Sequence, residues 1–185
     1  MTASTLVIRR FSGPQLSEFI EEVAHLRITV FRDFPYLYDG NMDYERKYLQ
    51  TYVQCEQAVV VVAFDGSTVV GASTGIPLHY EEENFRQPFI GQGYDPARIF
   101  YCAESVLLSK YRGQGAGVRF FEEREAHARS VGEFDYACFC SVVRPLHHPL
   151  RPAGYQALDG FWHKRGYTKA AHLSATYTWK DIDQP

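Results

Sequence analysis

The stretch Tyr111-Arg112-Gly113-Gln114-Gly115-Ala116-Gly117 decides how the rest of the chain is interpreted. Its three glycines stand between an apolar strand pattern and an amphipathic helix pattern. Glycine lets the backbone approach a ligand closely and adopts positive φ angles at little cost. A helix N-terminus adds unpaired N–H groups and partial positive charge. The stretch therefore predicts a backbone cradle for an anion such as a pyrophosphate, with Arg112 as a side-chain donor.

Two other phosphate-binding loops fit this stretch poorly. The G-x-x-x-x-G-K-[ST] pattern of nucleotide hydrolases does not occur in the chain. The dinucleotide pattern G-x-G-x-x-G begins at Gly113 and fails at Val118, where glycine is absent. The loop also follows several strands, and no acidic residue stands at a strand end about 20 residues further on, since Asp135 precedes its strand. A nicotinamide-dependent reductase is therefore disfavoured.

Composition and charge limit the class of protein. The chain has 185 residues, of which 45% are apolar and 22% charged, as in one soluble domain with a sizeable core. The formal net charge is −3 and no Lys/Arg run occurs, so the electrostatic signature of a nucleic-acid binder is missing. Tyr and Phe number 13 each. This surplus suits a large core, an aromatic pocket or the subunit interface of a homodimer.

The cysteines and the apolar segments bear on location. Cys55, Cys102, Cys138 and Cys140 form no C-x-x-C pair, and we interpret them as small buried side chains. No metal site is expected from them. No apolar window of about 18 residues occurs, which argues against a membrane span, and residues 1–10 lack the apolar stretch of a signal peptide. We therefore expect a reduced, cytoplasmic protein.

The order of predicted elements indicates one α/β domain of the mixed α+β type over residues 1–185. Residues 79–98 are interpreted as a long loop or a small insertion. An antiparallel meander feeding one β-loop-α-β unit predicts a mixed, mostly antiparallel, twisted sheet with helices on both faces. Strands are expected at residues 6–8, 58–64, 68–76, 99–108, 136–143 and 167–179, and helices from a start at 12–14 to 31 and at 44–53, 117–128 and 158–164.

The 111–117 stretch resembles the acyl-CoA pyrophosphate loop of the GNAT superfamily of N-acyltransferases, whose pattern is [Q/R]-x-x-G-x-[G/A]. Arg112, Gly115 and Gly117 occupy the three defined positions. The element order matches the family along almost the whole chain, and Phe161-Trp162-His163-Lys164-Arg165-Gly166-Tyr167 is similar to its late F-Y-x-x-x-G-F helix end. The resemblance implies transfer of an acetyl group from acetyl-CoA to a primary amine of a small molecule or peptide. The attack would be direct, in a ternary complex without a metal.

The resemblance also implies where acetyl-CoA binds. The fourth and fifth strands of such a domain splay apart and admit the pantetheine arm between them. Backbone of Val106, Leu107 and Leu108 would pair with pantetheine like an added strand, and one of these N–H groups would polarise the thioester carbonyl. The pyrophosphate would be held by the loop residues Arg112, Gly113, Gln114, Gly115, Ala116 and Gly117.

An alkyl amine must lose a proton before it attacks the thioester. Glu104 lies in an otherwise apolar strand pattern and shares strand parity with Val106 and Cys102. It is the candidate base or amine anchor, and polyamine acetyltransferases of the superfamily carry an acidic residue at the corresponding place. The alternative is a half-exposed carboxylate that pairs with an Arg or Lys of a neighbouring strand.

The acid that protonates the leaving thiolate is where the chain departs from the family. The family's Tyr in the late helix is replaced by Trp162, and an indole cannot donate a proton in this sense. Tyr155 is the nearest substitute in the sequence, unless it is a loop tyrosine that packs on the sheet. Water could also protonate the thiolate, or the thiolate could leave without help. Trp162 keeps open a second function, a non-catalytic acyl-CoA sensor of the same fold, whereas Glu104 favours an enzyme.

Three further groups of residues bear on the acceptor site. The aromatic residues near the end of the first helix would stack on a substrate or pack the helix hairpin, and we prefer packing. His147-His148 is interpreted as part of a stiff loop beside the acceptor site. The Glu81-Glu82-Glu83 run would draw in a cationic amine or, as in most charge runs, be solvated. The aromatic residues are Phe31, Phe34, Tyr36 and Tyr38.

Overall fold

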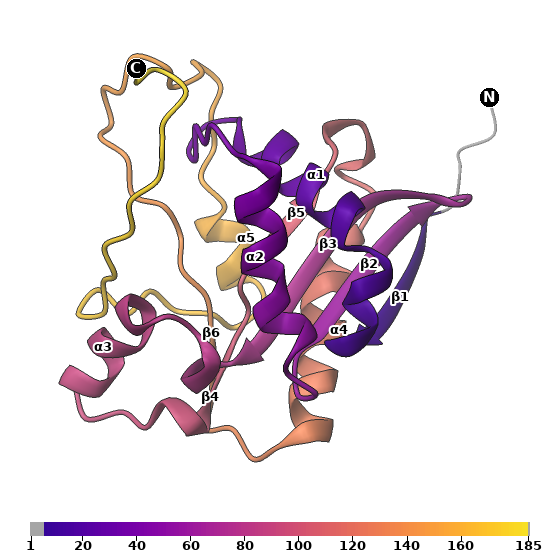
Figure 1. Cartoon of the computed structure of the whole chain (residues 1–185). Coiled ribbons are helices and arrows are strands. Elements are labelled where there is room, and N and C mark those ends of the chain that lie inside the picture. The colour runs from indigo at the N-terminus through magenta and orange to yellow at the C-terminus, as the bar shows by residue number, and fades with distance from the viewer. Residues whose placement is uncertain (1–5, 185) are drawn as a thin grey trace.

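A six-stranded mixed sheet forms the centre of the computed structural model, which describes residues 6–184. Helices α1 (Ile20–Phe31) and α2 (Met42–Val53) cover one face of this sheet, and α4 (Ala116–Val131) covers the other (Figure 1). The remaining helices are α3 (Glu83–Gly91) and α5 (Asp159–His163). The strands are β1 (Val7–Ser12), β2 (Val59–Asp65), β3 (Thr68–Pro77), β4 (Ile99–Tyr101), β5 (Ser105–Leu107) and β6 (Tyr136–Cys138).

The sheet topology confirms the predicted meander and crossover. Strands β1, β2 and β3 pair antiparallel in sequence order, and both β4 and β5 pair antiparallel with β3. After the α4 crossover, β6 lies parallel to β4. The order across the sheet is β1-β2-β3-β4-β6, with β5 beside β3. The Gly-rich loop therefore enters the only crossover helix that joins parallel strands in the described part of the chain.

The apolar run at residues 59–63 explains why both faces are covered. All five side chains are fully buried. Alternate side chains of a strand point to opposite faces, and here they enter two separate cores. Val60 and Val62 share a core with Leu49 of α2, whereas Val59 and Val61 share the other with residues of α4. A strand buried on both faces needs a continuous apolar run, which this segment supplies.

Helix starts differ slightly from expectation. Ser12 ends β1, and its hydroxyl contacts Gln15 Oε1 at 3.1 Å instead of capping a helix. Gly13 stands at the N-cap of a 3₁₀ turn, where a Cβ atom would lie only 2.2 Å from the Cys55 carbonyl oxygen. Helix α1 begins at Ile20 after that turn, and α2 begins at Met42. The expected helices near 117–128 and 158–164 are confirmed as α4 and α5.

Three expectations about strands are wrong in part. The strand expected over 99–108 is divided into β4 and β5, and the one expected over 136–143 ends at Cys138. Residues 167–179 form no strand in the described chain, although an isolated bridge joins Tyr38 to Asp181. Of the two alternatives for residues 79–98, a long loop or a small insertion, the structure shows an insertion that contains α3.

The side-chain pattern of residues 173–179 explains the strand that is missing. Exposure alternates along this segment, as it would on a strand with one buried face. The inward face packs on aromatic rings, with Tyr177 5.5 Å from Phe85 and Trp179 6.4 Å from Tyr36, instead of joining a ladder. The segment therefore has the period of a strand without strand pairing.

Among residues 6–184, no helix combines the length and the apolar character that a membrane span requires.

Candidate active site

A β-bulge separates β4 from β5 and sets the direction of Glu104. Tyr101 opposes Ile76 of β3, whereas Ser105 opposes Ser73, so three residues face two. Two of the three, Ala103 and Glu104, both bond to Thr74. The Thr74 N–H donates to the Glu104 carbonyl at 3.1 Å, and the Thr74 carbonyl accepts from the Ala103 N–H at 3.1 Å. Two residues opposite one make a bulge, which bends the strand and re-aims its side chains.

The extra residue corrects the predicted strand parity. Tyr101 and Val106 both belong to the core beneath α1 and α2, whereas Cys102 belongs to the core beneath α4. Glu104 also faces α1, where it meets Arg27. Glu104 therefore shares its face with Val106, as expected, but not with Cys102. A regular strand would have put all three on one face.

The bulge is held from the opposite side of the sheet by a buried cation. Arg124 of α4 is 2% exposed, and its Nη1 donates to the Glu104 carbonyl at 3.2 Å and to the Thr74 carbonyl at 3.4 Å. Its Nε donates to the Phe120 carbonyl at 3.2 Å. The Ser73 hydroxyl adds a further donor to the Glu104 carbonyl at 2.8 Å. These bonds fix the backbone at the point where the strand breaks.

The sheet opens beyond this bulge. The last hydrogen bond between the β4 segment and β6 runs from the Cys102 N–H to the Cys138 carbonyl at 2.8 Å. After it β5 pairs only with β3, and residues 139–143 pair with no strand among those described. We predicted that the strand before the Gly-rich loop and the strand after it splay apart. The separation of β5 from the segment that follows β6 confirms this prediction.

One edge of β5 faces this opening. Leu108 donates its N–H to the Val70 carbonyl at 3.0 Å, so Leu108 and Val106 direct their backbone groups towards β3. In an antiparallel ladder, residue pairs that bond to each other through their backbone groups alternate with pairs whose backbone groups point away from the partner strand. Ser105 and Leu107 consequently direct theirs towards the opening. Of the three residues predicted to pair with pantetheine, only Leu107 directs its backbone groups to the opening, and Ser105 does so as well.

The Gly-rich loop presents a row of free amide groups. The N–H groups of residues 113–117 have no hydrogen-bond acceptor in the part of the chain that the structure describes, and the first α4 bond to the loop comes from Val118. Gly113 and Gly115 have φ angles of 77° and 85°, which glycine adopts without strain. A Cβ atom at Gly117 would lie 3.2 Å from the Phe161 ring, so this glycine also allows α5 to pack closely.

Arg112 joins the loop to the open strand edge. Its Nε donates to the Leu107 carbonyl at 3.2 Å, and its Nη2 lies 4.0 Å from Asp33 Oδ2. The side chain is half exposed, so both the loop amides and this guanidinium are accessible to an anion. The arrangement can bind a phosphate group through backbone dipoles and one fixed charge.

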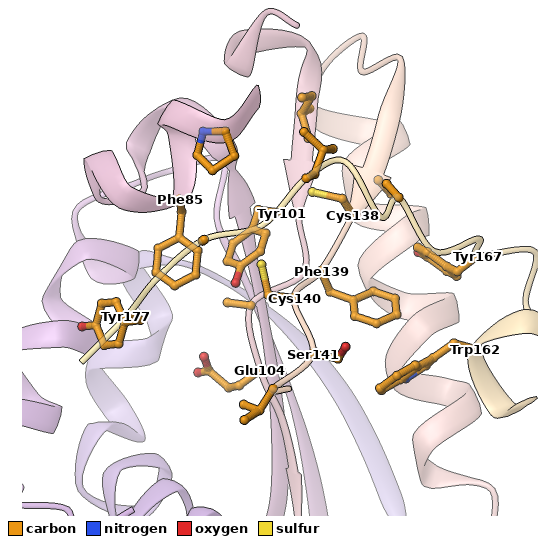
Figure 2. Close-up of a pocket in the computed structure, with 18 of the residues that line it drawn as sticks. Phe85, Tyr101, Glu104, Cys138, Phe139, Cys140, Ser141, Trp162, Tyr167 and Tyr177 are labelled. Atoms are coloured by element: carbon orange, nitrogen blue, oxygen red, sulfur yellow. The ribbon is translucent and has the colours of Figure 1, made fainter. Parts of the chain in front are cut away.

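A cleft of about 2420 Å³ runs from Glu104 to the segment that follows β6. Figure 2 shows Glu104, Tyr101 and Tyr177 on one side of the chain at Cys140, with Trp162 on the other. Three of the four aromatic residues predicted near the acceptor line this cleft, namely Phe31, Tyr36 and Tyr38. Phe31 also stacks on Tyr36 with ring centroids 4.2 Å apart, so these rings both pack together and line the cleft.

Glu104 is buried in an ion-pair network. Its side chain is 3% exposed, and Oε2 lies 2.7 Å from Nη1 of Arg27, which comes from α1. Arg27 Nε also bonds to the buried Glu45 of α2. Burial raises the pKa of Glu104 above its ordinary value, while the Arg27 guanidinium acts in the opposite direction. The alternative of a half-exposed carboxylate that pairs with an Arg or Lys of a neighbouring strand is wrong in burial, and its Arg partner comes from helix α1 instead of a strand.

A second buried acid was missed from the sequence. Glu81, expected to be solvated with its neighbours, is 4% exposed, and its Oε1 accepts from the Tyr52 hydroxyl at 2.6 Å. Burial raises the pKa of Glu81 to about 6. A signal was available in α2, where Glu45, Tyr48 and Tyr52 lie on one helical face beside the buried Leu49. A polar stripe on a buried face requires polar partners.

Tyr155 lies beside the cleft aromatics but is not among the residues that line the cleft. Its ring is 4.7 Å from Phe34, and Arg151 lies over it at 4.9 Å. Its hydroxyl has no hydrogen-bond partner among the described residues. His148 also packs on Phe34, at 5.9 Å, which fits a packed loop. Trp162 packs on Phe139 at 5.0 Å.

The cysteines are all free thiols in the structure. Cys55 and Cys102 are buried, as expected, but Cys140 is exposed because the strand ends before it. In residues 6–184 no group of three His, Cys, Asp or Glu side chains has the geometry to hold a metal ion.

No protein-family model matches the chain, and no curated protein sequence matches it. Its structure, however, resembles solved acetyltransferases over nearly the whole length. One is the aminoglycoside acetyltransferase AAC(6')-Iy in complex with the bisubstrate analogue CoA-S-monomethyl-acetylneamine. The TM-score is 0.58 at 12% identity, and the match covers 96% of this chain and 98% of that one.

Two further solved structures agree. An aminoglycoside acetyltransferase from an uncultured soil metagenomic sample, in complex with trehalose, gives a TM-score of 0.52 at 14% identity, covering 97% of this chain and 98% of that one. A GNAT family acetyltransferase from Streptococcus pneumoniae TIGR4 gives 0.52 at 12% identity, covering 97% and 100%. This chain therefore has the GNAT acetyltransferase fold.

Proposed function

We propose that this protein is a member of the GNAT superfamily and transfers an acetyl group from acetyl-CoA to a primary amine of a small molecule or peptide. The observation that supports this most is the row of unbonded N–H groups at residues 113–117, which adjoins the parted strands. Arg112 connects the two features through its bond to Leu107. A backbone anion site next to an open strand edge fits a molecule with a pyrophosphate and an extended amide arm.

The residues would divide the binding of acetyl-CoA between them. Residues 113–117 donate their N–H groups to the pyrophosphate, and Arg112 adds a charged donor. Leu107 and Ser105 offer the backbone edge that pairs with the pantetheine arm, in the manner of an added strand. Acetyl-CoA supplies an activated thioester, and a backbone N–H at this edge would polarise its carbonyl.

Glu104 is the proposed base for the acceptor amine. It accepts a proton from the ammonium group, and the neutral amine can then attack the thioester carbon. Arg27 holds the carboxylate in place through the 2.7 Å contact to Oε2. Burial keeps the Glu104 pKa from falling to that of an ordinary ion pair, which favours proton uptake.

Tyr155 is the proposed acid for the thiolate that leaves. Its hydroxyl is free of hydrogen bonds among the described residues, and its ring belongs to the aromatic group around Phe34, next to the cleft. The C–S bond breaks with its electron pair on sulfur, and the tyrosine proton would convert the thiolate to the thiol. Unassisted departure of the thiolate is the alternative.

The cleft suggests the character of the acceptor. Tyr36, Tyr38 and Tyr177 line it together with Phe85, so an apolar or sugar-like body could stack there. The carboxylate of Glu104 lies deeper and would attract a cation. We therefore expect an amine that carries its positive charge on a group next to a flat or ring-shaped body.

Trp162 favours a second candidate function, a non-catalytic acyl-CoA sensor of the same fold. It packs on Phe139 where the family's phenol would stand, and an indole supplies no acid. A sensor would bind CoA and release no thiol.

Two measurements test these functions. Calorimetric titration with CoA asks whether the loop binds it at all. Acetyl-CoA turnover, measured as free thiol release, is then compared over a panel that includes an arylalkylamine, a polyamine, an aminoglycoside and a peptide with a free amine. Binding with amine-dependent thiol release supports the enzyme, and binding without release for any amine supports the sensor. Failure to bind CoA would rule out both.

A further inference from the structure

A chain of hydrogen-bonded side chains leads from Glu104 to Glu81. The Tyr48 hydroxyl lies 3.4 Å from Glu104 Oε2, and the Tyr48 and Tyr52 hydroxyls are 2.9 Å apart. Tyr52 in turn lies 2.6 Å from Glu81 Oε1. Both carboxyl groups are buried, at 4% exposure each, and Tyr52 is fully buried. Two acids on separate segments are thus connected through two tyrosines of α2.

The protons in this chain can be counted. Three oxygen–oxygen contacts join the four groups, and each hydrogen bond needs one proton. The two tyrosine hydroxyls supply one proton each. When both carboxyl groups are ionised, one of the three contacts has no proton. When either carboxyl is protonated, all three are complete, with every bond pointing away from that acid. The chain is therefore complete with one added proton, which can reside at either end.

The charges around the chain also favour one added proton. Glu104 faces Arg27 from α1, and Glu45 from α2 shares that guanidinium. Arg124 lies across the sheet, where it bonds to carbonyl groups. Glu81 faces Tyr52 and its own neighbour Glu82, together with the thiol of Cys140 and the hydroxyl of Tyr101 from the other side. Arg27 thus serves two buried carboxylates, and Glu81 has no ion pair among the described residues. Buried charge without a partner is unfavourable.

We propose that Glu104, Tyr48, Tyr52 and Glu81 form a proton-transfer chain that carries the proton of the acceptor amine to Glu81. The idea rests on the proposed acetyl transfer. The ammonium group gives a proton to the Glu104 carboxylate, and the freed lone pair attacks the thioester. Glu104 then passes a proton to the Tyr48 oxygen, Tyr48 passes its own to Tyr52, and Tyr52 passes its own to Glu81. Glu104 is again a carboxylate, and Glu81 holds the proton.

Glu81 is suited to the role of terminal acceptor. The next residue in the chain, Glu82, is exposed at the N-terminal end of α3. A proton on Glu81 is therefore held next to a residue that solvent reaches. Burial raises the pKa of this carboxyl to about 6, close to the range in which a base exchanges protons readily near neutral pH. Glu81 and Tyr52 are therefore proton-relay residues, and Glu104 alone would touch the substrate.

A double-mutant cycle tests the chain. We expect Tyr52→Phe and Glu81→Gln each to lower kcat by at least about tenfold with the KM for the amine within about twofold. The double variant should show the same kcat as either single variant, because one interruption already stops transfer. Tyr80→Phe and Glu83→Gln are the matched controls and should keep wild-type kcat. Losses that multiply in the double variant would overturn the chain.

Infrared titration of the whole protein gives a readout that does not need turnover. A protonated carboxyl group absorbs separately from a carboxylate, and we expect one such buried group to titrate near pH 6, the pKa of Glu81. Its band should disappear in Glu81→Gln and persist in Glu83→Gln. A band unchanged by Glu81→Gln would overturn the proposal. A wild-type protein that shows the band but transfers acetyl to no amine would instead refute the proposed enzyme.

Discussion

Arg124 donates to the carbonyl oxygen of Glu104 across 3.2 Å, from the face of the sheet opposite to the one that holds the Glu104 carboxylate. Helix α4, which starts at the Gly-rich loop, thereby also fixes the strand bulge that carries the candidate base. In the proposed function, cosubstrate binding and the orientation of the base would therefore both depend on α4.

Replacing Arg124 by Met should lower the free energy of unfolding by about 2–4 kcal/mol, because three buried carbonyl contacts lose their charged donor. Urea unfolding measures the change. Arg129→Met on the same helix is the control: that side chain is 73% exposed and pairs with Glu125 at the surface, so its loss should be below about 1 kcal/mol. Equal effects in the two variants would contradict a structural role for Arg124.

Gly115→Glu should abolish CoA binding without unfolding the protein. The new carboxylate would stand among the free N–H groups and repel the pyrophosphate, and we expect the Kd to rise more than about 100-fold. Gly93→Glu is a close control, because Gly93 has a φ of 81° against 85° at Gly115 and both have open space around them. Backbone strain and added charge are thus matched. Calorimetric titration with CoA measures both affinities. Normal binding by both variants would contradict the assignment of the Gly-rich loop as the pyrophosphate site.

The fold could be predicted because its main signals are local. The apolar run at 59–63 and the Gly-rich loop at 111–117 determine the buried strand and the crossover helix, and both appear where expected. Residues 173–179 show the limit of such reasoning. Their alternation has the period of a strand, but it arises because Tyr177 and Trp179 pack on aromatic rings. A period of two in the apolar residues indicates that one face of the segment is buried, but it does not indicate that the segment pairs with another strand.

The candidate base was identified from the sequence, but its surroundings were not. The face that Glu104 occupies depends on a bulge held by Ser73 and Arg124, which are 31 and 20 residues away in the chain. Parity counting assumes an unbroken strand and therefore placed Cys102 on the wrong face. Its partner Arg27, and Glu81 at the far end of the hydrogen-bond chain, likewise come from segments that only the fold brings together.

The stability of the protein should depend on pH through Glu81. Burial raises its pKa from 4.5 to about 6, so the folded state binds this proton more tightly than the unfolded chain. Stability is therefore lost as pH rises through this window. Relative to Glu81→Gln, the wild type should lose about 2 kcal/mol between pH 4.5 and pH 7. Urea unfolding of both proteins across that range measures the difference, and parallel curves would contradict it.

Replacing Arg27 by Met should move the acid limb of the kcat/KM profile to higher pH. Arg27 lowers the pKa of Glu104, so without the guanidinium the carboxyl stays protonated to a higher pH and cannot accept the amine proton. We expect a shift of about one pH unit or more. Arg32→Met is the control, since that side chain is 59% exposed and contacts Asp39. An acid limb that stayed in place would remove Glu104 from the role of base.

Tyr155→Phe tests the proposed acid. The substitution keeps the ring that packs on Phe34 at 4.7 Å and removes only the hydroxyl, so stability should change little. If that hydroxyl protonates the thiolate, kcat should fall by about 100-fold, because the leaving sulfur then has no proton donor in the protein. Affinity for CoA should stay the same. Tyr80→Phe removes an exposed hydroxyl elsewhere and should have no effect on kcat. Wild-type turnover in Tyr155→Phe would instead indicate that the thiolate leaves unprotonated, as the low pKa of a thiol allows.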